Sequence, residues 1–527
     1  MQAASPVPRV RPGGGAGGGS ETAPPRRGIS AQRSANILRA LGSAGLVGVV
    51  ATSLVLAAGA ATRPTPYVPG RSGGWPGWLA GPLQGLGVGL GSGRYQALML
   101  IMSASYLLVL LAARTLPLRA LIAAIVAAHL ALLLGPPLIS QDVFGYLGFA
   151  RLGALHGLDP YTHVAAEAAS DPVFPFIGWP FKHSPYGPLF TLASYLAAPL
   201  GLAGGLWAFK ALAVASSLAA VALIARAAGR LGHSRRFAAA FVGLNPVLLA
   251  LAVAGAHNDT LLLLLLAATL ALSAGAAARP PAAAATLVAS VGIKVSAALL
   301  LPFLLLGTSG RRERLAIAAS AALSLVALGA IGLIGFGTHA LGFLGAVGEQ
   351  QQLVATHSVP AETARLVGLS GTPGWWRHVL LAGFVAVLVV ALWRTAKGTD
   401  WRVAAGWTTL ALLASTAWLL PWYAIWALPL AAVSGDRRLR AATLLFCAYA
   451  VLIHLPLADP LLSPKRAVVR RSAVALRRPV GALGRPAGAL AGPVGAPRGP
   501  AVALQQRHGV DLARLQVPRH AQLDLGG

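Results

Sequence analysis

Side chains that can move protons or bind anions are concentrated between residues 139 and 189. The chain has only 14 acidic residues against 42 basic ones, yet four of those acids fall in this segment. Tyrosines, histidines and a lysine accompany them, and together these residues are Asp142, Asp159, Glu167, Asp171, Tyr146, Tyr161, Tyr186, His163, Lys182 and His183. A carboxylate beside cationic and hydrogen-bonding groups suits general-base chemistry at a site that also binds an anionic group.

Asp142 is the first candidate for a general base. It follows an apolar run and precedes a predicted helix from Val143 to His156, so it should lie just beyond a membrane span. A carboxylate there can take the proton from an attacking hydroxyl. The alternative is that Asp142 only caps the helix that follows, because Asp is favoured at that position. Spacing alone leaves both interpretations open.

Three other charged residues also have simpler alternatives. Asp159 precedes Pro160, a pair typical of turns, and Asp259 opens an apolar helix, where capping is the default interpretation. Lys294 stands in an otherwise apolar run, and charges inside a membrane tend to be functional or paired because they are costly. Binding of a phosphate or lipid head by Lys294 and snorkelling of its side chain stay equal alternatives.

Further phosphate ligands and aromatic residues complete the candidate set. Arg151, Lys182 and His183 are alternative ligands for a phosphate near the outer loop. The tryptophans around Trp422 are typical of membrane-interface anchors, with stacking on a sugar as the second interpretation. The histidines lack a metal spacing such as HExxH, and the sequence shows no phosphate-binding glycine loop or nucleophile elbow. The sequence therefore does not indicate ATP hydrolysis or acyl transfer.

The composition of the chain indicates a polytopic membrane protein, whose helices must position these residues. Of 527 residues, 56% are hydrophobic and 11% charged, and the mean hydropathy is +0.69. A soluble domain carries roughly a quarter charged residues. Apolar runs of about 18 or more residues predict an all-α transmembrane bundle, since helices pair their own backbone groups in lipid. We predict about eleven to thirteen such segments.

The net charge of +28 fits a lipid bilayer better than a nucleic acid as partner. Much of the positive charge lies in two flanks and in short loops between apolar runs, which is the positive-inside pattern. On this topology the acid-rich loops face the outside. We therefore predict a multi-pass protein of the plasma membrane, with its active site on the extracytoplasmic face and no nucleic-acid partner.

The chain divides into three predicted regions. Residues 1–35 form a basic tail and residues 461–527 a tail rich in Arg, Pro, Gly and Ala, and both are predicted to be disordered. Residues 36–460 form the membrane domain. Inside it, the run from Pro281 to Leu306 is too short for two spans and has arginines on both sides, which predicts a broken helix pair with Lys294 at its middle.

A set of short motifs resembles the polyprenol-phosphomannose-dependent α-1,6-mannosyltransferases of actinobacterial cell envelopes. The motifs are Ser140-Gln141-Asp142-Val143 with Tyr146 and Arg151, Gly157-Leu158-Asp159-Pro160-Tyr161, Ser184-Pro185-Tyr186-Gly187-Pro188, Gly255-Ala256-His257-Asn258-Asp259, and Pro421-Trp422-Tyr423 with Trp426-Ala427-Leu428-Pro429. The resemblance covers about Leu121 to Leu457. Each motif alone is weak evidence, whereas the combination is quite specific.

The resemblance implies a GT-C architecture, a multi-span bundle whose active site lies on the outer face. It implies polyprenyl-phosphate-mannose as donor, a growing α-1,6-mannan of a lipoglycan as acceptor, and one inverting displacement. Asp142 matches the outer-loop acid that such enzymes use as base. The residues that we predict to bind substrate are Tyr146, Arg151, Asp159, Tyr161, Lys182, His183, Tyr186, His257, Asn258, Asp259, Lys294, Trp422 and Tyr423. No cofactor is expected, and no ligand cluster for a divalent metal is evident.

Two other classes of function compete with this interpretation. A transporter or flippase of a lipid-linked sugar would predict paired broken helices in two related halves, but the sequence shows one broken segment and no obvious repeat. A non-catalytic membrane scaffold would not need the acid-rich loop. Transfer of labelled mannose by membranes, compared between the natural chain and Asp142→Asn, distinguishes these three.

Overall fold

The computed structural model describes residues 26–62, 64–69 and 76–455. Within these ranges every regular element is a helix, which confirms the predicted all-α class. The two tails predicted over 1–35 and 461–527 lie outside the described residues, except that helix α1 (Arg26–Thr62) already begins inside the first of them.

Five helical stretches of the described chain are long and apolar enough to cross a membrane. They lie in α1, in α3 (Ser92–Ala112), in α6 (Pro188–Ser194) continued by η3 (Tyr195–Leu200) and α7 (Gly201–Arg230), in α12 (Arg311–Phe336) with η6 (Gly337–His339), and in α15 (Gly374–Ala396). A sixth forms if α8 (Arg235–Gly243) and η4 (Val247–Val253), which bend by 44°, cross together. Their length and composition are those of a multi-pass membrane protein.

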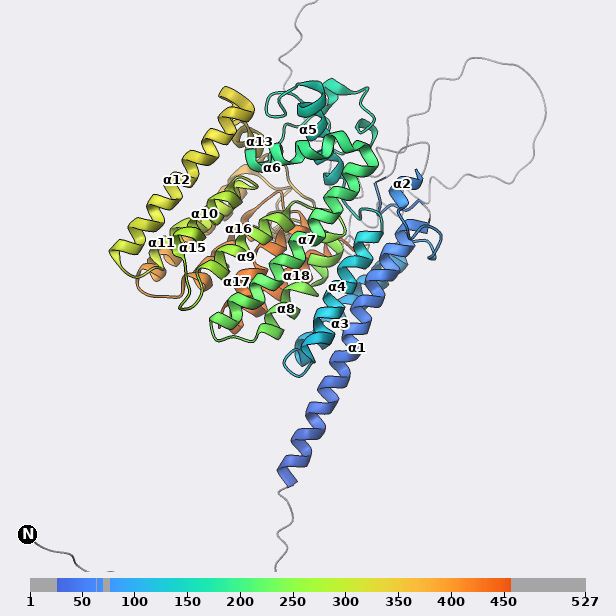
Figure 1. Cartoon of the computed structure of the whole chain (residues 1–527), viewed down its shortest axis with the longest axis vertical. Helices are drawn as coiled ribbons and strands as arrows, with labels where there is room; N and C mark the ends of the chain where they lie inside the picture. The colour runs from blue at the N-terminus through green and yellow to red at the C-terminus, as the bar shows by residue number, and fades with distance from the viewer. Residues whose placement is uncertain (1–25, 63, 70–75, 456–527) are drawn as a thin grey trace, which may run out of the picture.

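Shorter helices fill the spaces between these spans and build the site. They are α2 (Gly77–Ala80), α4 (Leu118–Leu134), α5 (Asp142–His156), η1 (Ala165–Ala168), η2 (Phe174–Phe176), α9 (Asp259–Leu272), α10 (Pro280–Val291), η5 (Val295–Leu300), α11 (Leu301–Leu306), α13 (Gly342–Gln351), α14 (Val359–Leu366), α16 (Trp401–Ser415), η7 (Pro421–Trp426), α17 (Leu428–Val433) and α18 (Arg437–Leu452). The long helices run in roughly one direction across the bundle, and α5, α6 and α13 gather at its upper end (Figure 1).

The predicted helix after Asp142 is confirmed as α5, which ends at Gly157 in the left-handed conformation (φ 67°). Glycine adopts that conformation without a steric penalty, so it stops the helix. From its spacing this helix was also expected to be amphipathic and to lie along the membrane surface, which would leave one face exposed. Most of α5 is buried, because α6, η3, α7 and η1 pack around it.

The predicted break at Lys294 is present. α10 ends at Val291, Lys294 is extended (φ −150°, ψ 121°), and η5 begins at Val295. α10 packs against α9 and α12, and η5 against α10 and α11. The break places the charged side chain at the end of two short helices rather than inside one.

Arginines hold helix ends together at the opposite end of the bundle from α5. Their guanidinium groups donate to carbonyls at or after the C-termini of other helices, in the pairs Arg39 and Thr115, Arg236 and Arg114, Arg230 and Ala271, and Arg402 and Ser273. Cations are favoured there because the last carbonyls of a helix are unpaired and carry partial negative charge. The cationic and the acid-rich ends of the molecule are therefore separate.

Candidate active site

Asp142 and His257 form the centre of the site. Asp142 begins α5, and its Oδ2 lies 3.3 Å from Nδ1 of His257, a polar contact rather than a well-aligned hydrogen bond. The Asp142 side chain is 17% exposed, whereas that of His257 is fully buried. Burial would raise the pKa of Asp142, but His257, the charge of Lys294 and the Ser140 hydroxyl together lower it below its ordinary value. An ionised carboxylate is thus available to accept a proton at neutral pH.

Aromatic stacking fixes the His257 ring. The ring lies on that of Trp422, with centroids 3.8 Å apart and an interplanar angle of 25°. Trp422 comes from η7 and His257 from the short loop between η4 and α9, so two distant segments position one imidazole. Trp422 is itself buried. The Trp422 ring therefore packs against the imidazole that contacts Asp142.

A second carboxylate orients the cation of the site. Oδ1 of Asp259 accepts from Nζ of Lys294 at 2.8 Å and from Nε1 of Trp426 at 2.7 Å. The ammonium also lies over the rings of Tyr423 (4.5 Å to the centroid) and Trp426 (5.2 Å), which attract a cation electrostatically. An ammonium has three donors, so Lys294 keeps donors for an anion after pairing with Asp259.

Two tyrosines, Tyr146 and Tyr186, lie near Asp142 and Asn258 in the same site. The Tyr146 hydroxyl donates to Oδ1 of Asn258 at 3.3 Å and accepts from the Asn258 backbone N–H at 3.3 Å. The Tyr146 and Tyr186 rings meet edge to face, 5.1 Å apart. Burial raises the pKa of Tyr186 well above its ordinary value, and the nearby carboxylates of Asp142 and Asp259 add to the increase. Its hydroxyl therefore stays protonated and can donate a hydrogen bond.

These contacts bring together nine of the residues predicted from the sequence. They are Asp142, Tyr146, Tyr186, His257, Asn258, Asp259, Lys294, Trp422 and Tyr423. Sequence reasoning left out two members, Ser140 and Trp426. Trp426 follows Tyr423 by three residues in η7, a spacing that could have placed it on the same face.

Arg151 is engaged elsewhere. It lies roughly 13 Å along α5 from Asp142, at about 1.5 Å per residue. Its Nε donates to both carboxylate oxygens of Asp171, at 2.9 and 3.0 Å, and Nε2 of His156 lies 2.8 Å from the same carboxylate. Burial would raise the pKa of Asp171, but Arg151, His156 and the Val173 N–H lower it. This cluster ties α5 to the loop before η2.

We expect Asp171→Asn to lower the free energy of unfolding by about 2 kcal/mol, the scale of hydrogen bonds to a charged group. Because the pKa of Asp171 is depressed in the folded chain, this stabilisation is complete above the ordinary carboxylate pKa. It is lost as the pH falls through the depressed value. Thermal unfolding of detergent-solubilised protein measures both effects. Glu313→Gln, an exposed change, should stay within about 0.5 kcal/mol, and equal losses in both variants would contradict the assignment.

Asp159 and Tyr161 lie outside the central group and support the backbone of Tyr186. Oδ1 of Asp159 accepts from the Tyr161 N–H at 2.8 Å, which is the turn that the sequence offered as its simpler interpretation. Oδ2 of Asp159 lies 3.2 Å from Nδ1 of His339. The Tyr161 hydroxyl donates to the backbone carbonyl of Tyr186 at 2.8 Å. Tyr161 thus holds the backbone of a residue in the site.

Lys182 and His183 form an outer polar layer with α13. Nδ1 of His183 lies 2.8 Å from Oε1 of Glu349, and Nζ of Lys182 lies 4.0 Å from Oε2. All three side chains are about one-third exposed. This layer is distinct from the Asp142, His257 and Lys294 group.

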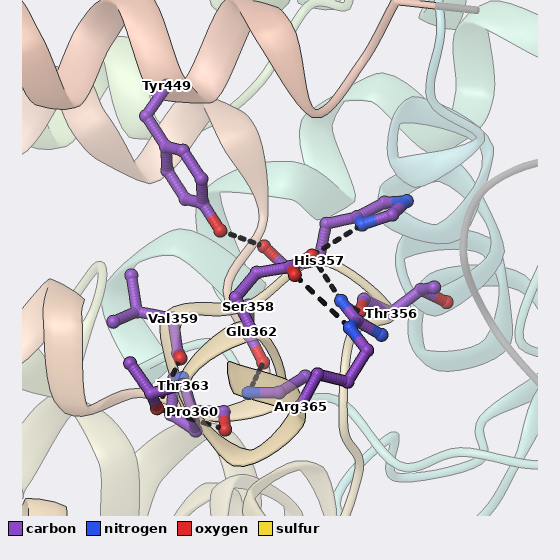
Figure 2. A network of polar contacts seen from close by, with 10 residues as sticks. Thr356, His357, Ser358, Val359, Pro360, Glu362, Thr363, Arg365 and Tyr449 are labelled. Carbon is purple, nitrogen blue, oxygen red and sulfur yellow. Dashed lines mark hydrogen bonds and ion pairs between the residues drawn. The ribbon is translucent and has the colours of Figure 1, made fainter. Parts of the chain in front are cut away.

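Figure 2 shows a third network, which fastens the start of α14. The Glu362 carboxylate contacts both Arg365 and Nδ1 of His357, the latter at 2.7 Å. The Tyr449 hydroxyl of α18 donates to the His357 carbonyl at 2.7 Å. Two residues before His357, the Ala355 N–H donates to the backbone carbonyl of Ala417 at 2.9 Å. The loop before α14 is thereby held against the segment that leads into η7.

An apolar groove adjoins the cation. It is a small, half-open hollow of about 20 Å³ between α9, η5, α16 and η7, and it is lined by Leu262, Leu266, Ser296, Ala297, Leu299, Leu300, Thr409, Leu412 and Trp426. Trp426 therefore belongs to both the groove and the Asp259–Lys294 cluster. In the described part of the chain, no three His, Cys, Asp or Glu residues lie together as a metal site.

The chain is similar to known proteins of one family. A family model described as "Alpha-(1->6)-mannopyranosyltransferase, N-terminal domain" matches residues 39–309, and one described as "MptB C-terminal domain" matches residues 367–477. The chain is 26% identical over 355 residues to alpha-(1->6)-mannopyranosyltransferase A of Mycobacterium tuberculosis (strain ATCC 25618 / H37Rv), covering 62% of this chain and 67% of that protein. No solved structure matches. The first model spans more than half of the sequence, so the chain belongs to the alpha-(1->6)-mannopyranosyltransferase family and is a mannosyltransferase.

Proposed function

We propose that this mannosyltransferase moves mannose from polyprenyl-phosphate-mannose to a growing α-1,6-mannan of a cell-envelope lipoglycan. The observation that carries the proposal is that one site holds two groups of opposite charge. Asp142 is an ionised carboxylate, and Lys294 is a cation close enough to lower its pKa. One group suits the proton of an incoming hydroxyl, and the other suits a departing phosphate.

The proposed reaction is a single displacement. Asp142 takes the proton from the acceptor's 6-hydroxyl while that oxygen forms a bond to C1 of the donor mannose. The bond between C1 and the phosphate oxygen breaks, and polyprenyl phosphate leaves with the electron pair. Attack from the opposite side converts the β-linkage of the donor into the α-linkage of the product. Asp142 releases the proton to water after the product departs.

His257 and Lys294 have different parts in this scheme. His257 holds the Asp142 carboxylate and keeps it ionised until the hydroxyl arrives. Lys294 donates to the phosphate oxygens, whose negative charge grows as the C1–O bond lengthens. Asp259 and the two rings beneath the ammonium hold that cation in place before the donor binds. Such preorganisation favours the transition state without reorganisation at the moment of reaction.

The apolar groove supports a lipid-linked donor. It begins at Trp426, which touches the Lys294 cluster, and an isoprenoid chain attached to a phosphate at Lys294 would find apolar walls there. Burial of apolar surface contributes about 25 cal/mol per Å². A nucleotide sugar would gain nothing from these walls.

We expect Leu412→Trp, which fills part of the groove, to raise the KM for the lipid-linked donor about tenfold, or about 1.4 kcal/mol. The kcat should change little, because the groove contributes equally to binding in the ground and transition states. Initial rates against donor concentration measure both constants. The control is Leu445→Trp on α18, whose native side chain is 73% exposed and does not line the groove. An unchanged KM in Leu412→Trp would remove the groove from the proposal.

The arrangement of charge supports an extracytoplasmic site in the plasma membrane. The arginine-capped helix ends lie away from α5, and basic ends of a membrane bundle favour the cytoplasm. On that orientation Asp142, His257 and Lys294 face the outside, where the mannan of a cell envelope is built.

The proposal is tested with membranes that contain the whole chain. Labelled polyprenyl-phosphate-mannose and a synthetic α-1,6-mannose oligosaccharide are supplied, and the product is digested with an α-1,6-specific mannosidase. We expect label in the lengthened oligosaccharide, none when GDP-mannose is the only donor, and release by the mannosidase. Movement of the lipid-linked sugar across the bilayer without transfer would instead support the flippase alternative.

A further inference from the structure

A buried lysine with no assigned role lies behind the site. Lys210 is in α7, is 1% exposed, and forms no ion pair within the described residues. Its Nζ donates to the backbone carbonyl of Ala254 at 3.4 Å and lies 5.8 Å from the centroid of the Trp207 ring. A cation inside a membrane span is costly, so its retention needs a physical reason.

The carbonyl that Lys210 contacts is the junction of the two segments that form the site centre. Ala254 follows the π-helix η4 and directly precedes the loop that carries His257. The same carbonyl accepts from the N–H of Leu138 at 3.1 Å, and Leu138 leads into Asp142. One oxygen atom therefore links both partners of the 3.3 Å carboxylate–imidazole contact, and the ammonium is its third neighbour.

The backbone on both sides of this junction is strained. Ile139 (φ 78°) and Ala256 (φ 56°) are the non-glycine residues with positive φ in the described ranges, and both lie within two residues of the junction. Such conformations cost about 1–3 kcal/mol each and persist only where the surroundings enforce them. Gly255 is equally confined, because a Cβ there would lie 2.7 Å from the His257 ring and 3.1 Å from the Leu138 carbonyl.

We infer that Lys210 is a positioning residue whose ammonium holds the Ala254 junction and thereby sets the distance between Asp142 and His257. At this residue, where η4 ends, Nζ of Lys210 is a second donor to the oxygen that already accepts from the Leu138 N–H. Without the ammonium, the strained segments on either side can relax and the imidazole can withdraw from the carboxylate. The inference rests on the proposed function of Asp142.

The effect of Lys210 should appear in the pH dependence of transfer. His257 is one of the groups that hold the pKa of Asp142 down, so its withdrawal raises that pKa and moves the acid limb of kcat/KM to higher pH. The charged and titratable groups that face Asp142 are His257, Lys294, Tyr146, Tyr186 and Tyr423, and Asp259 faces Lys294 and the three tyrosines. His257 is joined to Ala254 through Gly255 and Ala256, whereas no hydrogen bond in the described residues joins the other neighbours to the Ala254 carbonyl, so these should keep their effect.

The test compares Lys210→Met with Ser217→Ala in membranes, with rates normalised to the amount of inserted protein. Ser217 is buried on the same helix and contacts His129, so its loss removes a buried polar contact away from the junction. We expect Lys210→Met to lower kcat by about tenfold to a hundredfold, since small displacements of catalytic groups have effects of that order. Donor KM should stay within about twofold and the acid limb should move to higher pH. Ser217→Ala should retain the natural kcat and the natural pH dependence of kcat/KM on the acid side.

A double-mutant comparison separates positioning from general packing. If Lys210 acts through the imidazole, Lys210→Met should cause little further loss in a His257→Phe background, because interacting sites are not additive. Full additivity, an unchanged acid limb, or the same loss in Ser217→Ala would overturn the inference. If Lys210→Met does not accumulate, Lys210→Gln is measured in the same way. Wild-type activity in Asp142→Asn would instead overturn the proposed function, which distinguishes the two failures.

Discussion

Asp142→Asn should reduce mannosyl transfer by about two to four orders of magnitude, the usual contribution of a general base. The amide has nearly the shape of the carboxylate but cannot take the proton of the acceptor hydroxyl. Gln141 and not Asp142 is the N-cap of α5, so the change removes no helix cap and the fold should be retained. The loss should appear in kcat, with the KM of the lipid-linked donor changed far less, since the missing interaction belongs to the transition state.

The matched control for this prediction is Glu167→Gln. Glu167 is an exposed acid of the same loop, whose carboxylate accepts from the Val164 N–H. It lies outside the group formed by Asp142, His257 and Lys294, so transfer should stay within about twofold of the natural rate. Rates are measured with labelled donor under single-turnover conditions. Transfer at the natural rate by Asp142→Asn would remove Asp142 as the base and leave the mechanism without its proton acceptor.

Breaking the Asp259–Lys294 pair should have the largest effect on stability. Asp259 is 1% and Lys294 15% exposed in their side chains, and their closest atoms are 2.8 Å apart. Removing one member of a buried pair leaves an uncompensated charge and costs about 3–5 kcal/mol. We therefore expect Asp259→Asn and Lys294→Met each to lower the thermal unfolding temperature markedly. The double variant removes both charges and should recover most of that loss.

Activity should separate from stability in the same set of variants. If Lys294 binds the departing phosphate, the double variant regains its fold but not its transfer rate, because no cation remains at that position. If Lys294 only neutralises Asp259, the double variant should regain both. Unfolding curves and transfer rates on the same preparations decide between these outcomes, and recovery of the rate would contradict the phosphate role.

Local sequence was sufficient to predict some of the helical elements. It predicted the all-α class, a helix from Val143 to His156 and the break at Lys294, whereas only five or six of the eleven to thirteen predicted apolar segments are helices long enough to span a membrane in the described residues. These features depend on short-range effects, namely hydrophobic length, capping and the steric freedom of glycine. The exposed face expected for α5 was wrong, because periodicity does not reveal that α6 and η3 pack against this helix.

The pairing of charged groups depended on the tertiary structure. The sequence offered Arg151, Lys182, His183 and Lys294 as equivalent cations, and only the fold engages Arg151 with Asp171, Lys182 and His183 with Glu349, and Lys294 with Asp259. These partners are separated by 20 to 167 residues along the chain. No local pattern encodes such distances.

The sequence by itself determined that this chain is a helical membrane protein with an acid-rich region after one of its spans, and its motifs indicated the family. Only the tertiary structure decided that Asp142 meets His257, that Trp422 holds that ring, and that Lys210 lies behind the junction joining them. The physical reason is that helix formation is driven by neighbours in the chain, whereas the ionisation and orientation of a buried group depend on whatever distant residues pack around it.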